Sequence, residues 1–421
     1  MRYSGRVSEA SITRPLVALI VTNVLGGIGV ASGIAVGALL IASMGSTSLS
    51  GFGQALSVLG AGLLAVPLAN LAANHSRRRS LGVGYAIAAA GAVTILVAAW
   101  LGSLPLLFVG LLAFGAAQAT NLQTRYAASE LATPQRRATI MSIVIWATTI
   151  GSVLGPNLSK AGATLGRGVG LPDLAGPYLF SLTGFVLAML TVAFLFARRL
   201  PDAAPGSAPA AAAPGGRKMS ARQALAWASG HPVARFAVLL IVIGHAIMVG
   251  IMTMTPVHLT SLGHDLGGVG LVISLHILGM YALSPLVGWL ADRFGAMRTA
   301  LVGLIILGTS AVMVLVAPAS FGSVLAALFL LGVGWSFTTI SGSALLAGVD
   351  SGEVRVPLQG ATDALMNYGG AAAAVAGGPL IFAIGFGGLA IVAGALIIPA
   401  AAVGWVARGR RDPAFAASDQ R

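Results

Sequence analysis

Long apolar stretches recur along the chain, and short segments that carry most of the charged residues separate them. Each stretch is about 20 residues long, the length that an α-helix needs to cross about 30 Å of bilayer hydrocarbon. The pattern predicts twelve membrane-spanning helices, at residues 16–42, 49–73, 80–101, 104–126, 138–160, 176–197, 234–257, 267–290, 299–317, 322–345, 360–383 and 387–407. The first stretch is too long, and too lacking in a cleavage site, for a removable signal peptide.

The predicted helices fall into two halves. A segment rich in Pro, Ala and Gly interrupts the apolar pattern after the sixth helix, as is typical of a flexible linker. We therefore expect a six-helix bundle over residues 1–200, a cytoplasmic linker over 201–232, a second bundle over 233–408 and a tail over 409–421. Within the linker, "SARQ" at Ser220–Gln223 predicts the capped start of a short amphipathic helix.

Two pairs of similar phrases relate the halves to each other. The fifth helix carries "GSVLGP" and the eleventh carries "AVAGGP", while "LAANHSRRRS" follows the second helix and "LADRFGAMRT" follows the eighth. Repeated halves are typical of transporters in which two bundles rock about a central site. The expected fold class is an all-α membrane protein built from two pseudo-symmetric six-helix bundles.

Composition and charge agree with a lipid environment. Of 421 residues, 57% are hydrophobic and only 8% are charged, with a mean hydropathy of +0.92, which is too little charge for a soluble surface. Of the 24 Lys and Arg residues, 22 fall on one side of the predicted membrane, and only Lys160 and Arg167 fall on the other. The positive-inside rule then places both termini in the cytoplasm. The net charge of +13 follows from this topology and points to anionic lipid headgroups, not nucleic acid, as counterions.

The loop after the eighth predicted helix carries the most specific motif. Its sequence "GWLADRFGAMRTAL", Gly288 to Leu301, resembles the signature loop of the major facilitator superfamily, G-x-L-a-D-r-x-G-r-k. The resemblance implies the fold of that family, secondary transport, and a place for Asp292 and Arg293 in locking the cytoplasmic helix ends. A carboxylate at a helix end beside basic residues makes a clasp that is stable in one conformational state only.

The matching loop after the second helix departs from this pattern. Ala73 replaces the acidic residue and Ser76 the second glycine, although Arg77 and Arg78 keep the basic part. On the fourth helix, Gly110 stands where drug antiporters of the superfamily have an intramembrane arginine, so we do not expect a standard proton-driven drug antiporter. "GSVLGP" is similar to part of the Gly-Pro motif of those antiporters, and we interpret it as a device for close helix packing.

Four soft donors share two of the apolar stretches. "MVGIM" places Met248 and Met252 four residues apart, and "HILGM" does the same for His276 and Met280. Residues i and i+4 lie on one face of a helix, so two antiparallel helices can bring all four to one intramembrane site. Thioether sulfur and neutral imidazole suit Cu(I). Methionine is also a common packing residue, the interpretation we give to Met254.

The same spacing resembles the CcoA-like group of bacterial copper importers, in which these four positions are implicated in copper uptake. The resemblance implies a metal site formed by Met248, Met252, His276 and Met280. Because that group also includes flavin transporters, the motif leaves two kinds of cargo open, copper and an organic solute such as a flavin, a drug or a metabolite.

Other polar residues lie within or beside the predicted spans. His245 precedes Met248 by one turn and extends the same helix face. Asp363 and Asn367 near the start of the eleventh helix can couple protons, but a carboxylate there also complements the helix dipole, the interpretation we favour. The residues that either line a central cavity or bridge helices are Asn23, Gln54, Gln118 and Asn121. His258, His264 and Asp265 lie at the external turn between the seventh and eighth helices, where they either collect a metal ion or form a solvated turn, the interpretation we favour. The residues in or beside the cytoplasmic turn after the fourth helix are Arg125, Glu130, Arg136 and Arg137.

No enzyme signature occurs in the chain. The Gly-rich phosphate-binding loop followed by Lys and Ser or Thr is also missing, so we do not expect ATP to drive the protein. The absence of cysteine excludes disulfides and thiolate metal sites. The sequence predicts a secondary transporter that works by alternating access, as a monomer in a bacterial inner membrane and without a cofactor. Its cargo is copper or, alternatively, an organic solute coupled to protons. A non-transporting sensor on the same scaffold is the third alternative.

Overall fold

The computed structural model describes residues 9–44, 52–196, 219–349 and 352–408, which form helices and connecting turns without a β-strand. The first bundle comprises α1 (Glu9–Ser43), α2 (Phe52–Asn74), α3 (Arg77–Leu101), α4 (Leu104–Ser129), α5 (Arg137–Asn157), α6 (Ser159–Gly168) and α7 (Pro177–Leu195). A short helix, α8 (Ala221–Gly230), precedes the second bundle. That bundle comprises α9 (Pro232–Ser261), α10 (Leu266–Tyr281), α11 (Ser284–Phe294), α12 (Ala296–Val316), α13 (Phe321–Ala347), α14 (Gly352–Ala395) and α15 (Ile397–Arg408).

The helices match the predicted spans with three local differences. Eleven apolar helical stretches in the described part of the chain are long enough to cross a membrane, and one of them, Glu353–Arg408, covers 56 residues and two predicted spans. Gly385 divides that stretch, because its φ of 71° and ψ of 178° are not helical and such a φ is readily adopted only by glycine. The eighth span consists of α10 and α11 in series. The short α6, which follows α5 directly, was not predicted as a separate helix.

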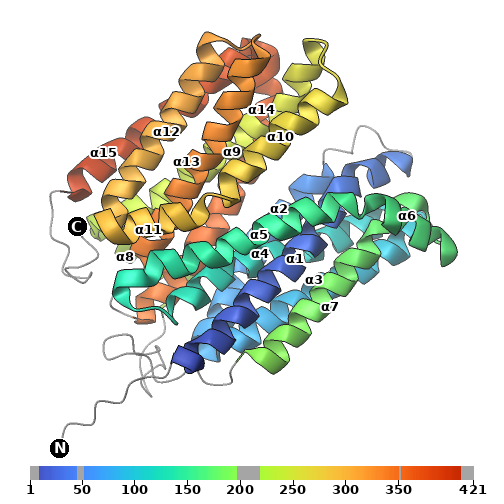
Figure 1. Ribbon diagram of the computed structural model, residues 1–421, viewed down its shortest axis with the longest axis horizontal. Coiled ribbons are helices and arrows are strands. Elements are labelled where there is room, and N and C mark those ends of the chain that lie inside the picture. Colours follow the sequence, from blue (N-terminus) through green and yellow to red (C-terminus); the bar gives the residue numbers. More distant parts are fainter. Residues whose placement is uncertain (1–8, 45–51, 197–218, 350–351, 409–421) are drawn as a thin grey trace, which may run out of the picture.

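The two bundles lie side by side, α1–α7 in blue to green and α9–α15 in yellow to red (Figure 1). Between them, α2 packs against α14 and α5 packs against α11. We call the end of the bundles that holds the α2–α3, α4–α5 and α11–α12 connections the basic end, because Arg77, Arg136 and Arg293 lie there. The other end is called the opposite end, and it holds α6 with Lys160 and Arg167.

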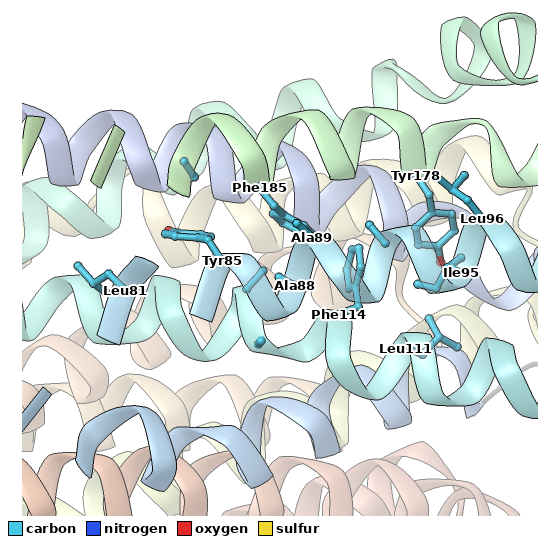
Figure 2. Packing of buried hydrophobic residues seen from close by; sticks show 14 of the residues in the cluster. Leu81, Tyr85, Ala88, Ala89, Ile95, Leu96, Leu111, Phe114, Tyr178 and Phe185 are labelled. Carbon is cyan, nitrogen blue, oxygen red and sulfur yellow. The ribbon is translucent and has the colours of Figure 1, made fainter. Parts of the chain in front are cut away.

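Aromatic side chains fill the interior of the first bundle. Phe114 of α4 lies edge-on to Tyr178 and Phe185 of α7, with ring centroids 5.6 and 5.1 Å apart (Figure 2). Two glycines of α1 make room for these rings, since a Cβ added at Gly29 would lie 2.5 Å from Phe185. The bundle is therefore held by ring packing against small residues, the arrangement expected where lipid gives no hydrophobic drive between helices.

The glycines of "GSVLGP" allow α5 to lie against α1. A Cβ added at Gly151 would lie 2.6 Å from the carbonyl carbon of Gly27, and one at Gly155 would lie 2.5 Å from the Cβ of Ala31. The interpretation of this motif as a close-packing device is confirmed.

The predicted capping box in the linker is confirmed as well. Ser220 and Gln223 exchange side-chain and backbone hydrogen bonds at the start of α8. Ala224 and Ala228 are buried in the same apolar cluster as Val354 and Leu358 of α14. The helix thus belongs to the surface of the second bundle, while residues 197–218 of the linker and the tail 409–421 lie outside the described residues.

Candidate functional site

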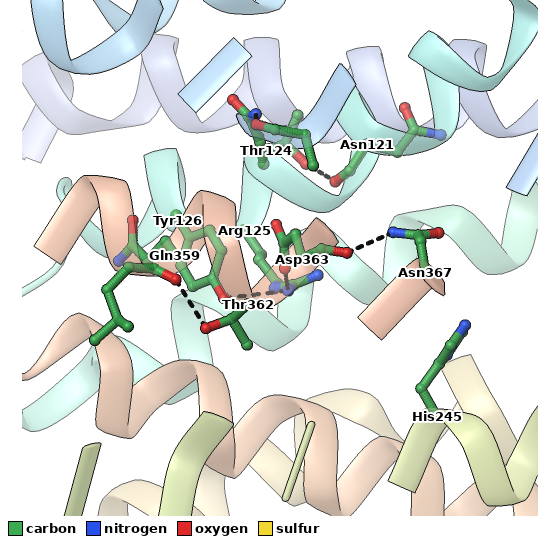
Figure 3. Close-up of polar contacts among 12 residues, drawn as sticks. Asn121, Thr124, Arg125, Tyr126, His245, Gln359, Thr362, Asp363 and Asn367 are labelled. Atoms are coloured by element: carbon green, nitrogen blue, oxygen red, sulfur yellow. Dashed lines mark hydrogen bonds and ion pairs between the residues drawn. The ribbon is translucent and has the colours of Figure 1, made fainter. Parts of the chain in front are cut away.

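A buried ion pair joins the two bundles. Arg125 of α4 donates from Nη2 to Oδ1 of Asp363 on α14 at 2.5 Å, and each side chain is only 1% exposed. Tyr126 borders the pair, because its hydroxyl lies 3.2 Å from the same Nη2 and its ring lies 4.6 Å from the guanidinium carbon. Figure 3 shows the pair between the two helices.

Several polar atoms of this site lack partners. In the described part of the chain, Arg125 Nε, Asp363 Oδ2 and Asn367 Oδ1 are buried without a hydrogen bond. Asn367 lies one turn beyond Asp363 on α14 and donates from Nδ2 to the carbonyl oxygen of Asp363 at 2.8 Å. Buried polar atoms are normally paired, so unpaired ones at a bundle interface indicate a place for a proton, water or solute.

His245 of α9 borders the same site, as Figure 3 shows. Trp335 of α13 donates from Nε1 to His245 Nδ1 at 3.0 Å. An indole nitrogen can only donate, so Nδ1 of the imidazole is the acceptor and the neutral ring carries its proton on Nε2. Gly370 of α14 leaves the space that this ring occupies, since a Cβ there would lie 2.9 Å from Nε2.

A second link lies nearer the basic end. Arg77, the first residue of α3, binds Glu130 Oε1 through Nε and Nη2 at 3.0 and 2.8 Å. Its Nη2 also donates to Gln359 Oε1 of α14 at 3.0 Å, across the bundle interface. The first-half loop therefore keeps a link between bundles although Ala73 replaces its carboxylate. Arg78 instead binds the carbonyl oxygen of Ala193 within its own bundle.

A third link uses the carboxylate of the signature loop. Asp292, near the end of α11, accepts hydrogen bonds from the backbone N–H groups of Ala138 at 3.0 Å and Thr139 at 2.8 Å. These groups belong to the first turn of α5, so the carboxylate of one bundle caps a helix of the other. Arg293, the next residue, is exposed in the last turn of α11.

The Met/His quartet lies in the apolar interior of the second bundle. Met248 and Met280 are buried in one cluster, and Met252 and Met254 pack against it half-buried. His276 is fully buried, and its Nδ1 lies 2.8 Å from the carbonyl oxygen of Leu328 on α13. That carbonyl can only accept, so the other nitrogen, Nε2, keeps a free lone pair and has no hydrogen-bond partner among the described residues. The four-residue metal site remains a prediction.

Comparison with known proteins decides the family. The sequence profile of the Major Facilitator Superfamily matches residues 17–268 and 236–420, so that each half is matched. The chain belongs to the Major Facilitator Superfamily. It is accordingly a multi-pass membrane transporter and not an enzyme.

Relatives within the superfamily are similar over most of their length. The uncharacterized MFS-type transporter YdeG of Bacillus subtilis (strain 168) is 36% identical over 401 residues, which cover 94% of this chain and 92% of that protein. The riboflavin transporter RfnT of Brucella anthropi is 28% identical over 333 residues, covering 78% and 79%. A structure of the MFS transporter FucP in the outward conformation superposes with a TM-score of 0.73 at 14% identity, covering 96% and 100%, which shows the fold alone. These relatives do not support the copper-importer subgroup.

The polar residues predicted to line a cavity in the first bundle differ in their surroundings. Asn23 is buried and donates to Thr124 Oγ1 of α4 at 2.5 Å, and Asn121 accepts from the Tyr85 hydroxyl at 2.7 Å. Both residues thus bridge helices within one bundle. Gln118 of α4 is half-buried, and Gln54 is exposed in the first turn of α2, at the opposite end.

The residues predicted to lie in the external turn have structural partners. His258 Nε2 lies 2.7 Å from the carbonyl oxygen of Pro318, and its ring stacks on Phe386. Asp265 caps α10 by accepting from the N–H of Gly268 at 2.8 Å. Among the described residues, no group of three or more His, Cys, Asp or Glu side chains is arranged to hold a metal ion.

Two sequence interpretations are wrong. Arg125 does not belong to the cytoplasmic turn or its border, because α4 continues to Ser129 and the side chain is buried. Asp363 does not serve the helix dipole, because α14 begins at Gly352, about three turns earlier, and the dipole acts within the first turn. The sequence feature that indicated an interior position for Arg125 is its spacing from Gln118 and Asn121, which puts three polar residues on one face of the fourth helix.

Proposed function

We propose that the chain is a proton-coupled secondary transporter of a small organic solute, working by alternating access as a monomer in a bacterial inner membrane. The basic end then faces the cytoplasm, in agreement with the positive-inside rule. The observation that supports the proposal is the buried Arg125–Asp363 pair, which spans the two bundles and keeps unpaired polar atoms on both members. Sites between the two repeats are where transporters of this kind bind solutes and coupling ions.

The state of the structure fits this reading. The links of Asp292 with α5, of Arg77 with Gln359 and of Arg125 with Asp363 all join the bundles toward the basic end. With that end in the cytoplasm, the bundles are closed inward. Opening inward then requires these three links to break together.

Asp363 is the residue proposed to carry the proton. Among the described residues it is the only carboxylate in the buried set, so no other interior group offers a carboxylate for this purpose. Riboflavin, the cargo of the relative RfnT, is the first solute to test because that protein covers most of this chain.

We expect Asp363→Asn to abolish proton-driven accumulation. In proteoliposomes with a gradient of one pH unit, a transporter that moves one proton with each solute concentrates it about tenfold, because one pH unit is worth about 1.36 kcal/mol. The variant should equilibrate the solute to a ratio of one while still exchanging labelled for unlabelled solute. Uptake of labelled riboflavin and of other organic solutes with and without the gradient measures this. Gradient-driven accumulation by the variant equal to that of the parent contradicts the proposal.

Copper remains a second candidate cargo because of one observation. The Nε2 atom of His276 is buried and unpaired, and Nδ1–H is held by a backbone carbonyl, which is how metal-binding imidazoles are oriented. Met248 and Met280 lie in the same apolar cluster of the second bundle. Copper would be cargo here, not a resident cofactor.

If copper is carried, Met248→Leu and Met280→Leu should each lower uptake of labelled copper strongly, since each removes one of at most four soft donors while nearly conserving volume. Met254→Leu is the matched control, because Met254 packs beside Gly377 and lies outside the quartet. If all three variants accumulate as much copper as the parent protein, these thioethers serve only packing.

A further inference from the structure

We propose that Arg125 binds an anionic group of the transported solute, a carboxylate or a similar planar oxyanion, in exchange for Asp363. The solute class is then organic anions that travel with one proton. This inference rests on the proposed function and adds to it the chemistry of the cargo.

The ion pair of the structure is incomplete. A guanidinium can bind a carboxylate through two parallel N–H bonds. Here one bond of 2.5 Å joins Arg125 Nη2 to Asp363 Oδ1, and both Arg125 Nε and Asp363 Oδ2 lack a partner in the described structure. Asp363 therefore does not use all the N–H donors of the Arg125 guanidinium. The Nε–H group remains available to a second oxyanion.

The position of the pair makes an exchange of partners necessary. Arg125 and Asp363 belong to different bundles, so they separate when the bundles part at the basic end. A buried charge that loses its only oppositely charged partner is strongly unfavourable. Asp363 is the only buried carboxylate among the described residues, so that part of the chain offers Arg125 no second one. An anion carried by the solute provides the missing counterion.

Protonation of Asp363 balances this exchange. A proton from the external solution binds the free Oδ2 of Asp363 and makes a neutral carboxylic acid. Arg125 then donates its N–H groups to an oxygen of the solute anion instead of Oδ1. The site holds one positive and one negative charge before and after the step, so the entry of one proton with one monoanion moves no net charge. Release toward the cytoplasm reverses both exchanges and restores the pair.

The surroundings of the pair fit this exchange. The charged and titratable groups that interact electrostatically with Asp363 are Arg125 and Tyr126 on α4 and Arg77 on α3, and His245 on α9 interacts in the same way with Arg125. Because Trp335 occupies Nδ1 of His245, the neutral imidazole directs its Nε2–H toward the α14 face that holds Gly370. We assign that N–H as a second donor for a solute oxygen between the bundles.

Chemical rescue tests the inference without a known solute. Asp363→Ala removes the resident carboxylate, and formate has the same anionic group in a molecule small enough to replace it. We expect the purified full-length variant to melt at a lower temperature than the parent. Formate, compared with chloride at equal ionic strength, should raise that melting temperature in a saturable way, while formamide, its neutral analogue, should not.

Two further variants make the result decisive. The double variant Arg125→Met/Asp363→Ala should show no formate-specific rise, because it lacks the guanidinium. Asp363→Asn, which keeps the side-chain shape, serves if the alanine variant does not fold, and formate should stabilise it too. A rise of equal size in the double variant, or none in either single variant, overturns the anion site. Formate rescue together with proton-independent solute uptake by the parent would instead overturn only the proposed function.

Discussion

Replacing Asp363 alone by Leu is expected to destabilise the folded protein by about 3–5 kcal/mol, because Arg125 is then left charged and unpaired in a buried interface. The converse change, Arg125→Met, strands the carboxylate of Asp363 and should cost about as much. The double variant Arg125→Met/Asp363→Leu should recover most of the loss, since apolar side chains of similar volume replace a buried pair at little cost. The melting temperatures of the parent, the two single variants and the double variant, measured on purified protein in detergent, test this order of stability.

An exposed ion pair provides the control. Arg167 and Asp173 lie 3.3 Å apart at the opposite end, with side chains 63% and 56% exposed. Asp173→Leu should change stability by at most about 1 kcal/mol, because water replaces its partner. If both single variants of the buried pair melt like the parent, or if the double variant melts below them, then Arg125 and Asp363 do not neutralise each other in a buried interface.

Asp292→Asn is expected to shift the balance between the forms closed and open at the basic end by about tenfold or more toward the open form. The two backbone N–H groups of Ala138 and Thr139 lose a charged acceptor, and hydrogen bonds to charged groups contribute about 1.5–3 kcal/mol each. A difference of 1.4 kcal/mol is a factor of ten in the equilibrium constant. Since the chain has no cysteine, a single Ser142→Cys substitution reports this balance without a background of other thiols. Ser142 is buried at the basic end beside Gly288 of α11, so its alkylation rate rises when the bundles part there.

The matched control is Asp265→Asn. Asp265 also caps a helix through a backbone N–H, but its partner Gly268 belongs to the same bundle. The control variant should lose a similar local interaction and leave the alkylation rate of Ser142→Cys unchanged. An Asp292→Asn protein in which that rate equals the parent's value would show that this carboxylate does not lock the basic end.

The membrane spans could be predicted because they depend on local composition. A bilayer sets the length of each apolar stretch, so the break at Gly385 was visible in a short window of sequence. The N-cap of α8 at Ser220 was visible from its capping pattern. The central pair was not visible in this way. Arg125 and Asp363 are 238 positions apart, and their contact depends on how two bundles pack. Arg125 was also assigned to the border of the cytoplasmic turn, because the predicted fourth helix ended only one residue later.

The sequence did not determine toward which neighbouring helices the Met/His quartet points, because this depends on how each helix is oriented about its own axis. The i, i+4 spacing fixes that Met248 and Met252 share a face, but not which neighbour this face meets. In the structure, α10 packs closely on α13, where a Cβ added at Gly279 would lie 2.5 Å from the carbonyl oxygen of Phe329. His276 consequently hydrogen-bonds to α13 through Nδ1. Hydropathy does not reveal which neighbouring helix a given helix face contacts, because small residues on the facing helices determine this packing.

The Asp292 link has a consequence for how the two halves evolve. The hydrogen bonds from Ala138 and Thr139 come from main-chain N–H groups, which every residue type except proline provides. A substitution at the buried Ala138 is therefore limited by the space around its side chain and not by the bond to Asp292. Among homologous sequences we expect little pairwise co-variation between positions 292 and 138. Second-site suppressors of Asp292 variants should instead map to residues that stabilise the inward-closed form elsewhere in the bundle interface.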